Sequence, residues 1–325
     1  MAVENSDSAI KGVNRREKKV LLTWSWIKRH RIILMLAMIV LISVFLRFYD
    51  LGTKSIWTNE AQSILESNLS VQGMVKASNQ PPLYDLILHN WISLFGTSEA
   101  ALRFPSAIFS VLTVVVIYFA GSALFHKRTG LIAAFISSFS SFLIAYSYDA
   151  RDYALLALLS TLSYWFFIEI IRKDEKKYYA AYIVSSILLI FTHFYSLFII
   201  ASQVLFILIF IKKYKAKISK YAIIMGIPIM FGAIPMLMLL KGNISHIAEE
   251  GFWISVPGNL STVETLVNFS GSGPAKYEIF GIFSLFAILG IFMLIKQRYR
   301  HTSTDVDQPR QSRLQSQEII ILLLL

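Results

Sequence analysis

Residues 104–125 read FPSAIFSVLTVVVIYFAGSALF and run directly into the basic triplet His126-Lys127-Arg128. An apolar run of about 20 residues is long enough to cross a bilayer as a helix. The same combination of an apolar run and a basic cluster recurs along the chain, with further clusters at 11–31, 172–177, 212–220 and 296–300. Because Lys and Arg concentrate in the loops that stay in the cytoplasm, this alternation predicts a multi-span membrane protein with a cytoplasmic N-terminus.

The composition agrees with a membrane protein. Of the 325 residues, 55% are hydrophobic and only 16% are charged, whereas soluble domains are about 25% charged. The net charge of +11 comes from basic residues in short loops between apolar runs, so we expect membrane lipids with anionic headgroups as partners and no nucleic acid. The chain has no cysteine, which excludes disulfides and thiolate metal sites.

The predicted fold is all-α: a polytopic integral membrane protein of about eight transmembrane helices with external juxtamembrane helices. A cytoplasmic basic arm at 1–31 precedes a transmembrane domain at 32–300, with a first external loop at 49–103 and a long external loop at 241–276. The polar tail at 301–325 ends in EIIILLLL, which resembles the start of a ninth span that has been cut off. The eight apolar runs lie at about 32–48, 104–125, 129–147, 153–171, 178–193, 194–211, 221–240 and 277–295.

Residues 82–96, PLYDLILHNWISLFG, form an apolar stretch that is too short to span and carries Asp85, His89 and Asn90. Counting it as a span would place the later basic clusters outside. We expect instead an amphipathic helix in the external interface. Its apolar face would carry Leu83, Leu86, Ile87, Trp91 and Leu94.

Polar residues of the kinds that catalyse reactions or bind ligands gather in the predicted external segments. The first loop contains SIWTNEAQS at 55–63 and NQPPLY at 79–84. The next external turn contains YSYDARDYAL at 146–155, and the third contains Thr192-His193-Phe194. Carboxylates, arginines and a histidine are thereby predicted to meet at one face of the membrane, above an apolar interior.

These segments resemble motifs of the GT-C superfamily of membrane glycosyltransferases, in particular the protein O-mannosyltransferase and aminoarabinose transferase group (families 39 and 83). That group shows W-x-D-E-A-x-S and H-P-P-L-Y in the first external loop, then F-G-x-S-E-x-A-L-R-x-P-S, Y-S-Q-E-A-R-M-Y-A-L and T-H-Y. The matching segments here begin at Trp57, Gln80, Phe95, Tyr146 and Thr192. The order and spacing of the set, over about residues 30–275, make the resemblance specific.

The resemblance implies a glycosyltransferase that moves a sugar from a polyprenyl-phosphate donor to an acceptor protein, lipid or glycan, with inversion at the anomeric carbon. A carboxylate would take the proton of the acceptor hydroxyl, and fixed cations would stabilise the phosphate leaving group. It also implies a prokaryotic plasma membrane, with the active face external. No cofactor follows with certainty, and a divalent cation stays an open alternative.

Two departures from the family pattern bear on catalysis. Asn59 stands where the pattern has Asp, and an amide cannot accept a proton as a base. The catalytic base would then be Glu60 or Asp149. The donor phosphate is assigned first to Arg151 and then to Arg103 and His193. Acceptor or sugar contacts are assigned to Trp57, Gln80 and Tyr153.

A structural role is the alternative for each of these side chains. Glu60 could cap an interfacial helix, Asp149 and Arg151 could form a surface ion pair, and His193 could be satisfied by backbone groups. We expect Arg103 to extend from the end of its helix to the membrane surface. Asp152 is predicted to be a solvated helix end, and Trp57, Trp91 and Trp253 to be belt residues at the interface.

Two other functions remain open. Because of Asn59 and the abrupt end of the chain, a catalytically silent or truncated homologue with a binding or assembly role is the main alternative. A transporter is the third, but the sequence lacks paired helices broken by Gly or Pro in matching halves.

Overall fold

The computed structural model describes residues 29–77, 80–233 and 261–270, with isolated positions at 258, 277–278, 281, 284–285, 288–289, 319 and 321. Throughout this part of the chain the regular structure is helical. Residues 1–28, most of the predicted loop 241–276, the eighth predicted span and most of the tail lie outside the described residues, as does Trp253.

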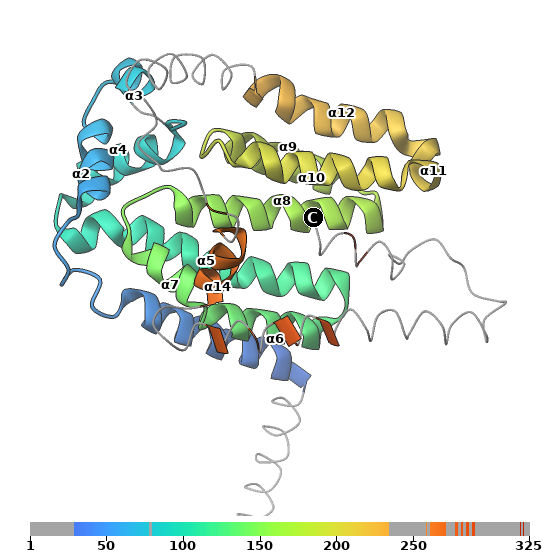
Figure 1. Ribbon diagram of the computed structural model, residues 1–325, viewed down its shortest axis with the longest axis horizontal. Coiled ribbons are helices and arrows are strands. Elements are labelled where there is room, and N and C mark those ends of the chain that lie inside the picture. The colour runs from blue at the N-terminus through green and yellow to red at the C-terminus, as the bar shows by residue number, and fades with distance from the viewer. Residues whose placement is uncertain are drawn as a thin grey trace, which may run out of the picture.

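The predicted all-α architecture is confirmed (Figure 1). A first helix, Arg29–Phe48, precedes the others. In chain order these are α2 Thr58–Ser67, α3 Val71–Ala77, α4 Leu83–Phe95, α5 Glu99–Leu124, α6 Lys127–Ser138, α7 Ser141–Ala145, the 3-10 turn η1 Tyr146–Tyr148, α8 Tyr153–Lys173, α9 Lys176–Ile190, α10 Ser196–Ile209, α11 Ile211–Tyr214, the 3-10 turn η2 Lys215–Lys217, α12 Ile218–Pro228, the π-helical turn η3 Ile229–Ala233 and α14 Ser261–Ser270.

Among the described residues, three helices are long and apolar enough to cross a membrane: Arg29–Phe48, Glu99–Leu124 and Tyr153–Lys173. Two bent pairs raise this number to five if each pair forms one span: Lys127–Ser138 with Ser141–Tyr148, bent by 55°, and Ser196–Ile209 with Ile211–Gly232, bent by 79°. The predicted runs at 178–193 and 194–211 do form helices, but α9 has only 15 residues and α10 only 14. The described residues therefore give three to five spans, and eight remains a prediction.

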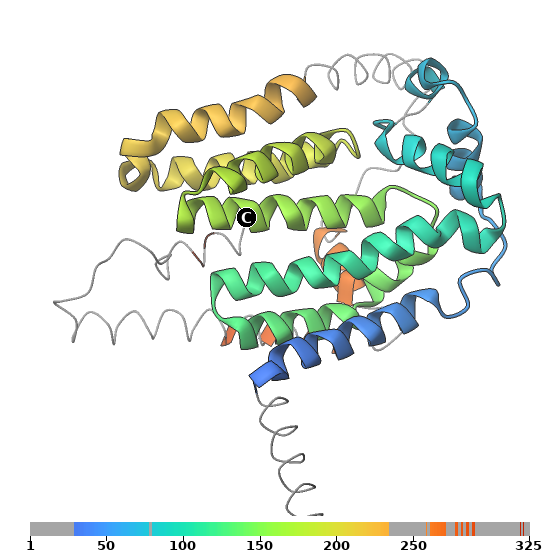
Figure 2. The same cartoon turned by 180° about the vertical axis from the view of Figure 1, so that it is seen from behind.

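The helices are arranged so that the bundle has two chemically different ends (Figures 1 and 2). The connections α5–α6 and α8–α9, together with α11, lie at one end, and they carry the basic clusters at 126–128, 172–177 and 212–220. Helices α2, α3 and α4 lie at the opposite end. We call these the basic end and the site end. This separation is what the alternation of basic and less basic connectors predicts.

A side chain of the short helix α4 replaces a hydrogen bond that proline removes from α5. Pro105 lies inside α5 and has no N–H for the carbonyl of Ala101, four residues earlier. The indole Nε1 of Trp91 donates to this carbonyl at 2.8 Å. Trp91 therefore has a structural task beyond the interfacial belt. The predicted helix at 82–96 exists as α4, and it turns Tyr84 and Leu88 toward the protein while Leu94 is 76% exposed.

A buried arginine donates hydrogen bonds to the backbone carbonyls at the break between α6 and α7. Arg47, at the end of the first helix, is fully buried. Its guanidinium donates to the carbonyls of Ser138 at 3.0 Å and Ser137 at 3.2 Å, and to the hydroxyl of Ser110 at 2.7 Å. The last carbonyls of a helix have no partner inside it, so Arg47 permits the bend and ties the first helix to α5 and α6.

Candidate active site

The candidate site is assembled at the site end from segments far apart in the sequence. Helix α2 packs on α4, and α4 packs on the start of α5. The backbone N–H of Leu83 donates to the carbonyl of Phe191 at 3.0 Å, which holds the beginning of α4 against the α9–α10 turn. The segment 149–152, which precedes α8, completes the cluster. The predicted meeting of the three polar segments is therefore observed.

A buried ion pair joins α2 to α5. Arg103 and Glu60 are 2% and 1% exposed, and they form two parallel hydrogen bonds, Nε to Oε1 at 2.8 Å and Nη2 to Oε2 at 2.7 Å. The backbone N–H of Ala150 also donates to Glu60 Oε1 at 2.9 Å, and that of Trp57 to Oε2 at 3.3 Å. Burial alone would raise the pKa of Glu60, but these hydrogen bonds outweigh it and hold the pKa below its ordinary value.

Arg103 has no donor left for a ligand in this arrangement. A guanidinium has five N–H donors. Besides the two on Glu60, the others donate to the carbonyls of Leu51 at 3.2 Å, Lys54 at 2.7 Å and Ser55 at 3.2 Å. The expectation that Arg103 extends to the membrane surface was wrong, because the first loop folds over it and supplies carbonyl acceptors. The geometry also argues against a phosphate-binding role for Arg103 and against Glu60 as a base.

Arg151 differs from Arg103 in the donors that it retains. Its Nη1 donates to the carbonyl of Asn59 at 3.2 Å and to the hydroxyl of Ser63 at 3.1 Å. Its Nε is buried and has no hydrogen-bond partner. The guanidinium lies 5.9 Å from the ring centre of Tyr153. Arg151 is thus anchored to α2, and its Nε–H is left without an acceptor inside the protein.

Asp149 is a half-buried carboxylate two residues before this arginine. Burial raises the pKa of Asp149 above its ordinary value, and the negative charge of Glu60 raises it further. Arg103, a hydrogen bond from the Trp57 side chain and Arg151 act in the opposite direction. A carboxylate with a raised pKa and partial exposure suits proton transfer better than one held in an ion pair.

His193 is held as a neutral donor. It is 5% exposed, and its Nδ1 accepts a hydrogen bond from the backbone N–H of Tyr195 at 3.1 Å. The proton of the neutral ring then resides on Nε2. Burial lowers the pKa of His193 to about 4, and the positive charge of Arg151 contributes. Its ring centre lies 5.9 Å from that of Tyr153, so His193, Tyr153 and Arg151 form one group.

Asp152 is a second residue that the sequence interpretation misplaced. It was expected to be a solvated helix end, but it is 5% exposed at the beginning of α8. Its Oδ2 is buried without a hydrogen-bond partner. Burial raises its pKa to about 6. The sequence carried one available signal, since Asp152 directly follows Arg151 and precedes an apolar helix, where an acid is costly.

The remaining predicted residues are Trp57, Asn59 and Gln80. Trp57 is 46% exposed at the start of α2, and Asn59 is half-buried with its carbonyl on Arg151. Gln80 is half-buried just before α4. Among the residues that the structure describes, no three His, Asp or Glu side chains are placed to hold a metal ion, so the geometry adds no support for the divalent-cation alternative.

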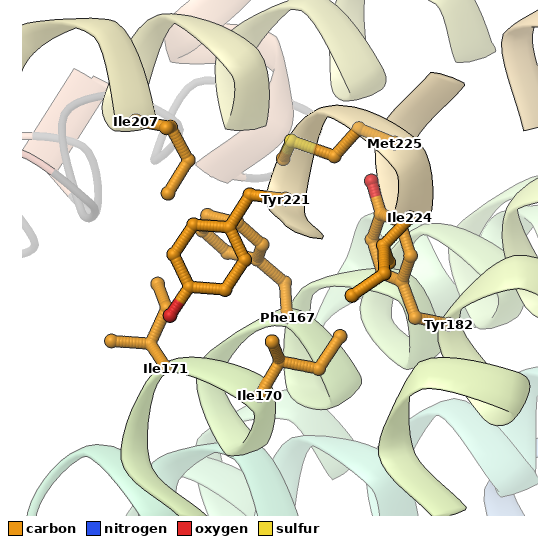
Figure 3. Close-up of a pocket in the computed structure, with 8 residues that line it drawn as sticks. All are labelled: Phe167, Ile170, Ile171, Tyr182, Ile207, Tyr221, Ile224 and Met225. Atoms are coloured by element: carbon orange, nitrogen blue, oxygen red, sulfur yellow. The ribbon is translucent and has the colours of Figure 1, made fainter. Parts of the chain in front are cut away.

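An apolar pocket is present at the other end of the bundle. Figure 3 shows side chains of α8, α9, α10 and α12 around it. The cavity between these side chains has a volume of only about 10 Å³, roughly the space that one water molecule needs. Phe167 lines it, and along α8 this residue is about 21 Å from Tyr153 at the helical rise of about 1.5 Å per residue. The pocket is therefore separate from the candidate active site.

Comparisons with known proteins agree with this picture. A family model described as dolichyl-phosphate-mannose-protein mannosyltransferase matches residues 79–238. An uncharacterized protein of Aquifex aeolicus is 29% identical over 163 residues, which cover 46% of this chain and 33% of that relative. The chain thus spans about a third of the length of this relative.

Solved structures of the Archaeoglobus fulgidus oligosaccharyltransferase share the fold. The apo form has a TM-score of 0.54 at 17% identity, over 89% of this chain and 41% of that chain. The same enzyme, AglB, in complex with an inhibitory peptide and a dolichol-phosphate has a TM-score of 0.53 at 17% identity, over 88% and 40%. The shared fold and the family match confirm the resemblance that the motifs predict: this chain is a membrane protein of the GT-C fold, similar to the dolichyl-phosphate-mannose-protein mannosyltransferases.

Proposed function

We propose that this chain transfers a sugar from a polyprenyl-phosphate-linked donor to an acceptor, with inversion at the anomeric carbon. The observation that carries the proposal is the group formed by Arg151, His193 and Asp149. It combines N–H donors for a phosphate with a carboxylate for a proton, at the end of an apolar bundle. The archaeal relative was solved with a dolichol-phosphate, which supports a donor of the same class here.

The proposed reaction needs three groups around one anomeric carbon. The acceptor oxygen forms the new glycosidic bond while the bond between the carbon and the phosphate oxygen breaks, and in-line attack inverts the centre. Asp149 takes the proton of the acceptor hydroxyl. The polyprenyl phosphate leaves as an anion, stabilised by Arg151 and by Nε2–H of His193. Glu60 and Arg103 support the site structurally and take no part in the reaction. Each forms hydrogen bonds with the other and with backbone groups.

A protein acceptor is favoured over the lipid and glycan alternatives. The matching family is described as protein mannosyltransferases, and one structure of the archaeal relative is tethered with an acceptor peptide. Exposed Trp57, next to Asp149, is proposed to contact the acceptor, with Gln80 nearby. The site end would face the outside of a prokaryotic plasma membrane, because the basic end carries the Lys and Arg clusters that stay in the cytoplasm.

The silent-homologue alternative rests on a specific residue. Asn59 replaces the acid of the family motif, and its carbonyl holds Arg151. If no other residue replaces the base that is missing at Asn59, the site would bind the donor but would not transfer its sugar.

Donor binding by Arg151 variants tests the proposal. Arg151→Lys keeps the charge but loses the fork that meets phosphate oxygens, so binding of a polyprenyl-phosphate sugar to purified protein should weaken about 5- to 100-fold, as expected for a charge-assisted hydrogen bond. The matched control is Arg128→Lys, an exposed arginine in the first turn of α6 at the basic end, which should bind as wild type does. Unchanged binding by Arg151→Ala would refute the assignment.

A further inference from the structure

Asp152 presents a buried carboxylate oxygen that nothing in the protein satisfies. The residue is 5% exposed, and its Oδ2 has no hydrogen-bond partner. It provides no side-chain cap for α8 either. The charge of Arg151 and the backbone N–H of Asp152 itself favour the carboxylate, but a buried oxygen without a donor is destabilising, so Oδ2 calls for a ligand that donates a hydrogen bond to it.

A second open group lies on the neighbouring residue. The Nε of Arg151 is also buried without a partner. One open group is a donor and the other an acceptor, and both belong to consecutive residues at the start of α8. A ligand that satisfies both must offer an acceptor oxygen and a hydrogen-bond donor, such as a hydroxyl, close together. A sugar attached to a phosphate has this combination.

Burial decides which substrate reaches Asp152. Asp149 is only half-buried and Trp57 is 46% exposed, so an acceptor arriving from outside meets these residues first. Asp152 is more deeply buried, and it interacts electrostatically with Glu66 of α2 and Tyr84 of α4. The deep position suits the sugar of the donor, which is covalently fixed to the phosphate that Arg151 binds.

The charges around Asp152 narrow the class of sugar. The carboxylate of Glu66, 8% exposed on α2, acts on Asp152 and raises its pKa. One oxygen of Glu66 accepts a hydrogen bond from Gln62 at 2.8 Å. Two carboxylates close enough to act on each other electrostatically favour hydroxyl donors and repel a negatively charged sugar.

We infer that Asp152 accepts a hydrogen bond from a hydroxyl of the donor sugar, so that the site selects a carrier loaded with a neutral sugar over the bare carrier or one loaded with a uronic acid. This inference rests on the proposed function. Asp152 is thus a specificity-determining residue for the donor. The glycosyltransferase motif Y-S-Q-E-A-R-M-Y-A-L has Met at the position of Asp152. We therefore expect the backbone at this position to accept an apolar side chain of similar length.

The test compares two ligands that differ only in the sugar: polyprenyl-phosphate mannose and unloaded polyprenyl phosphate. Wild type should bind the loaded carrier more tightly. Asp152→Asn and Asp152→Met should each lose about 10- to 100-fold in affinity for the loaded carrier, the range for a hydrogen bond to a charged group, and keep their affinity for the unloaded carrier. Glu175→Gln, a carboxylate that is 45% exposed at the basic end, is the matched control and should change neither affinity.

Each outcome separates the inference from the function on which it rests. If wild type binds neither carrier, the proposed function fails and this inference with it. If wild type binds the loaded carrier but both Asp152 variants bind it equally well, or lose both carriers to the same degree, Asp152 does not read the sugar. A measurement on wild type alone is independent of variant folding: equal binding of mannose-loaded and uronate-loaded carriers would also overturn the inference.

Discussion

Two carboxylates of the candidate site, Glu60 and Asp149, should respond differently to loss of charge. Glu60 is locked to Arg103 by two hydrogen bonds inside the protein. Breaking a buried pair by removing one charge costs on the order of 3–5 kcal/mol, so Glu60→Gln should lower the thermal unfolding midpoint. Asp149→Asn should leave this midpoint nearly unchanged and reduce sugar transfer about 10²- to 10⁴-fold.

The two readouts, unfolding midpoint and transfer rate, separate structure from chemistry. If Glu60→Gln unfolds at the wild-type midpoint but transfers no sugar, Glu60 is the catalytic base. Full transfer by Asp149→Asn would remove Asp149 from the reaction.

Asp152 predicts a pH dependence of stability. Its folded pKa of about 6 lies above its ordinary value of 3.8, so the folded state binds the proton more tightly. The stabilising contribution of this proton is present below pH 4 and is lost as the pH rises to about 6. Integrated over this window, wild type should lose on the order of 3 kcal/mol relative to Asp152→Asn.

Unfolding of the two proteins in detergent between pH 4 and pH 7 measures this difference. The groups that face Asp152 are Arg151 on its own segment, Glu66 on α2 and Tyr84 on α4. An unchanged difference across the pH range would mean that the carboxylate is satisfied in solution.

For individual residues, the sequence predicted which side chains meet but not what each of them does. The motifs brought Glu60, Arg103 and Asp149 to one site correctly. They could not show that the first loop supplies three carbonyls to Arg103 or that Asp152 is enclosed, because both depend on how 49–57 and α4 fold over the bundle. Sequence spacing carries no information about such closure.

At the scale of the helices, α5 and α6 pack at backbone distance through glycine. A Cβ built on Gly130 would lie 2.4 Å from the carbonyl oxygen of Tyr118 and 2.2 Å from the hydroxyl of Ser122. Small residues permit such close approach of membrane helices. Gly130→Ala should therefore force the helices apart and cost about 1–3 kcal/mol.

Gly226→Ala is the matched control, because a Cβ at that position of α12 meets no atom within 4 Å. It should be neutral or slightly stabilising, since alanine favours the helix by up to about 1 kcal/mol. Equal effects of the two substitutions on the unfolding midpoint would contradict the close α5–α6 packing.

Hydrophobic runs predicted where the long helices lie, but not where they break. The run at 129–147 contains the bend between α6 and α7, where Arg47, some 90 residues earlier, donates to the carbonyls at the end of α6. The bend between α10 and α11 leads to the basic segment around Lys212. Such breaks depend on distant partners for backbone carbonyls, so periodicity within a run does not reveal them.

For the whole molecule, the orientation in the membrane is proposed from the separation of the basic end from the site end. Because the chain has no cysteine, single cysteines report their side of the membrane without interference. A cysteine at Ser70, in the first loop, should react with an impermeant reagent in intact cells. A cysteine at Ser219, next to the basic segment, should react only after permeabilisation, and the reverse pattern would overturn the orientation.

A sugar-transfer assay tests whether this chain is a transferase in which Asp149 acts as the base. Membranes that contain this chain should transfer the labelled sugar of a polyprenyl-phosphate donor to an acceptor peptide, and Asp149→Asn should lose most of that transfer. Asn59→Asp, which restores the family motif, should raise the rate if the native site is impaired there. Donor binding without transfer in wild type, with transfer gained by Asn59→Asp, would support the silent homologue. Absence of both donor binding and transfer in wild type and in Asn59→Asp would contradict the account.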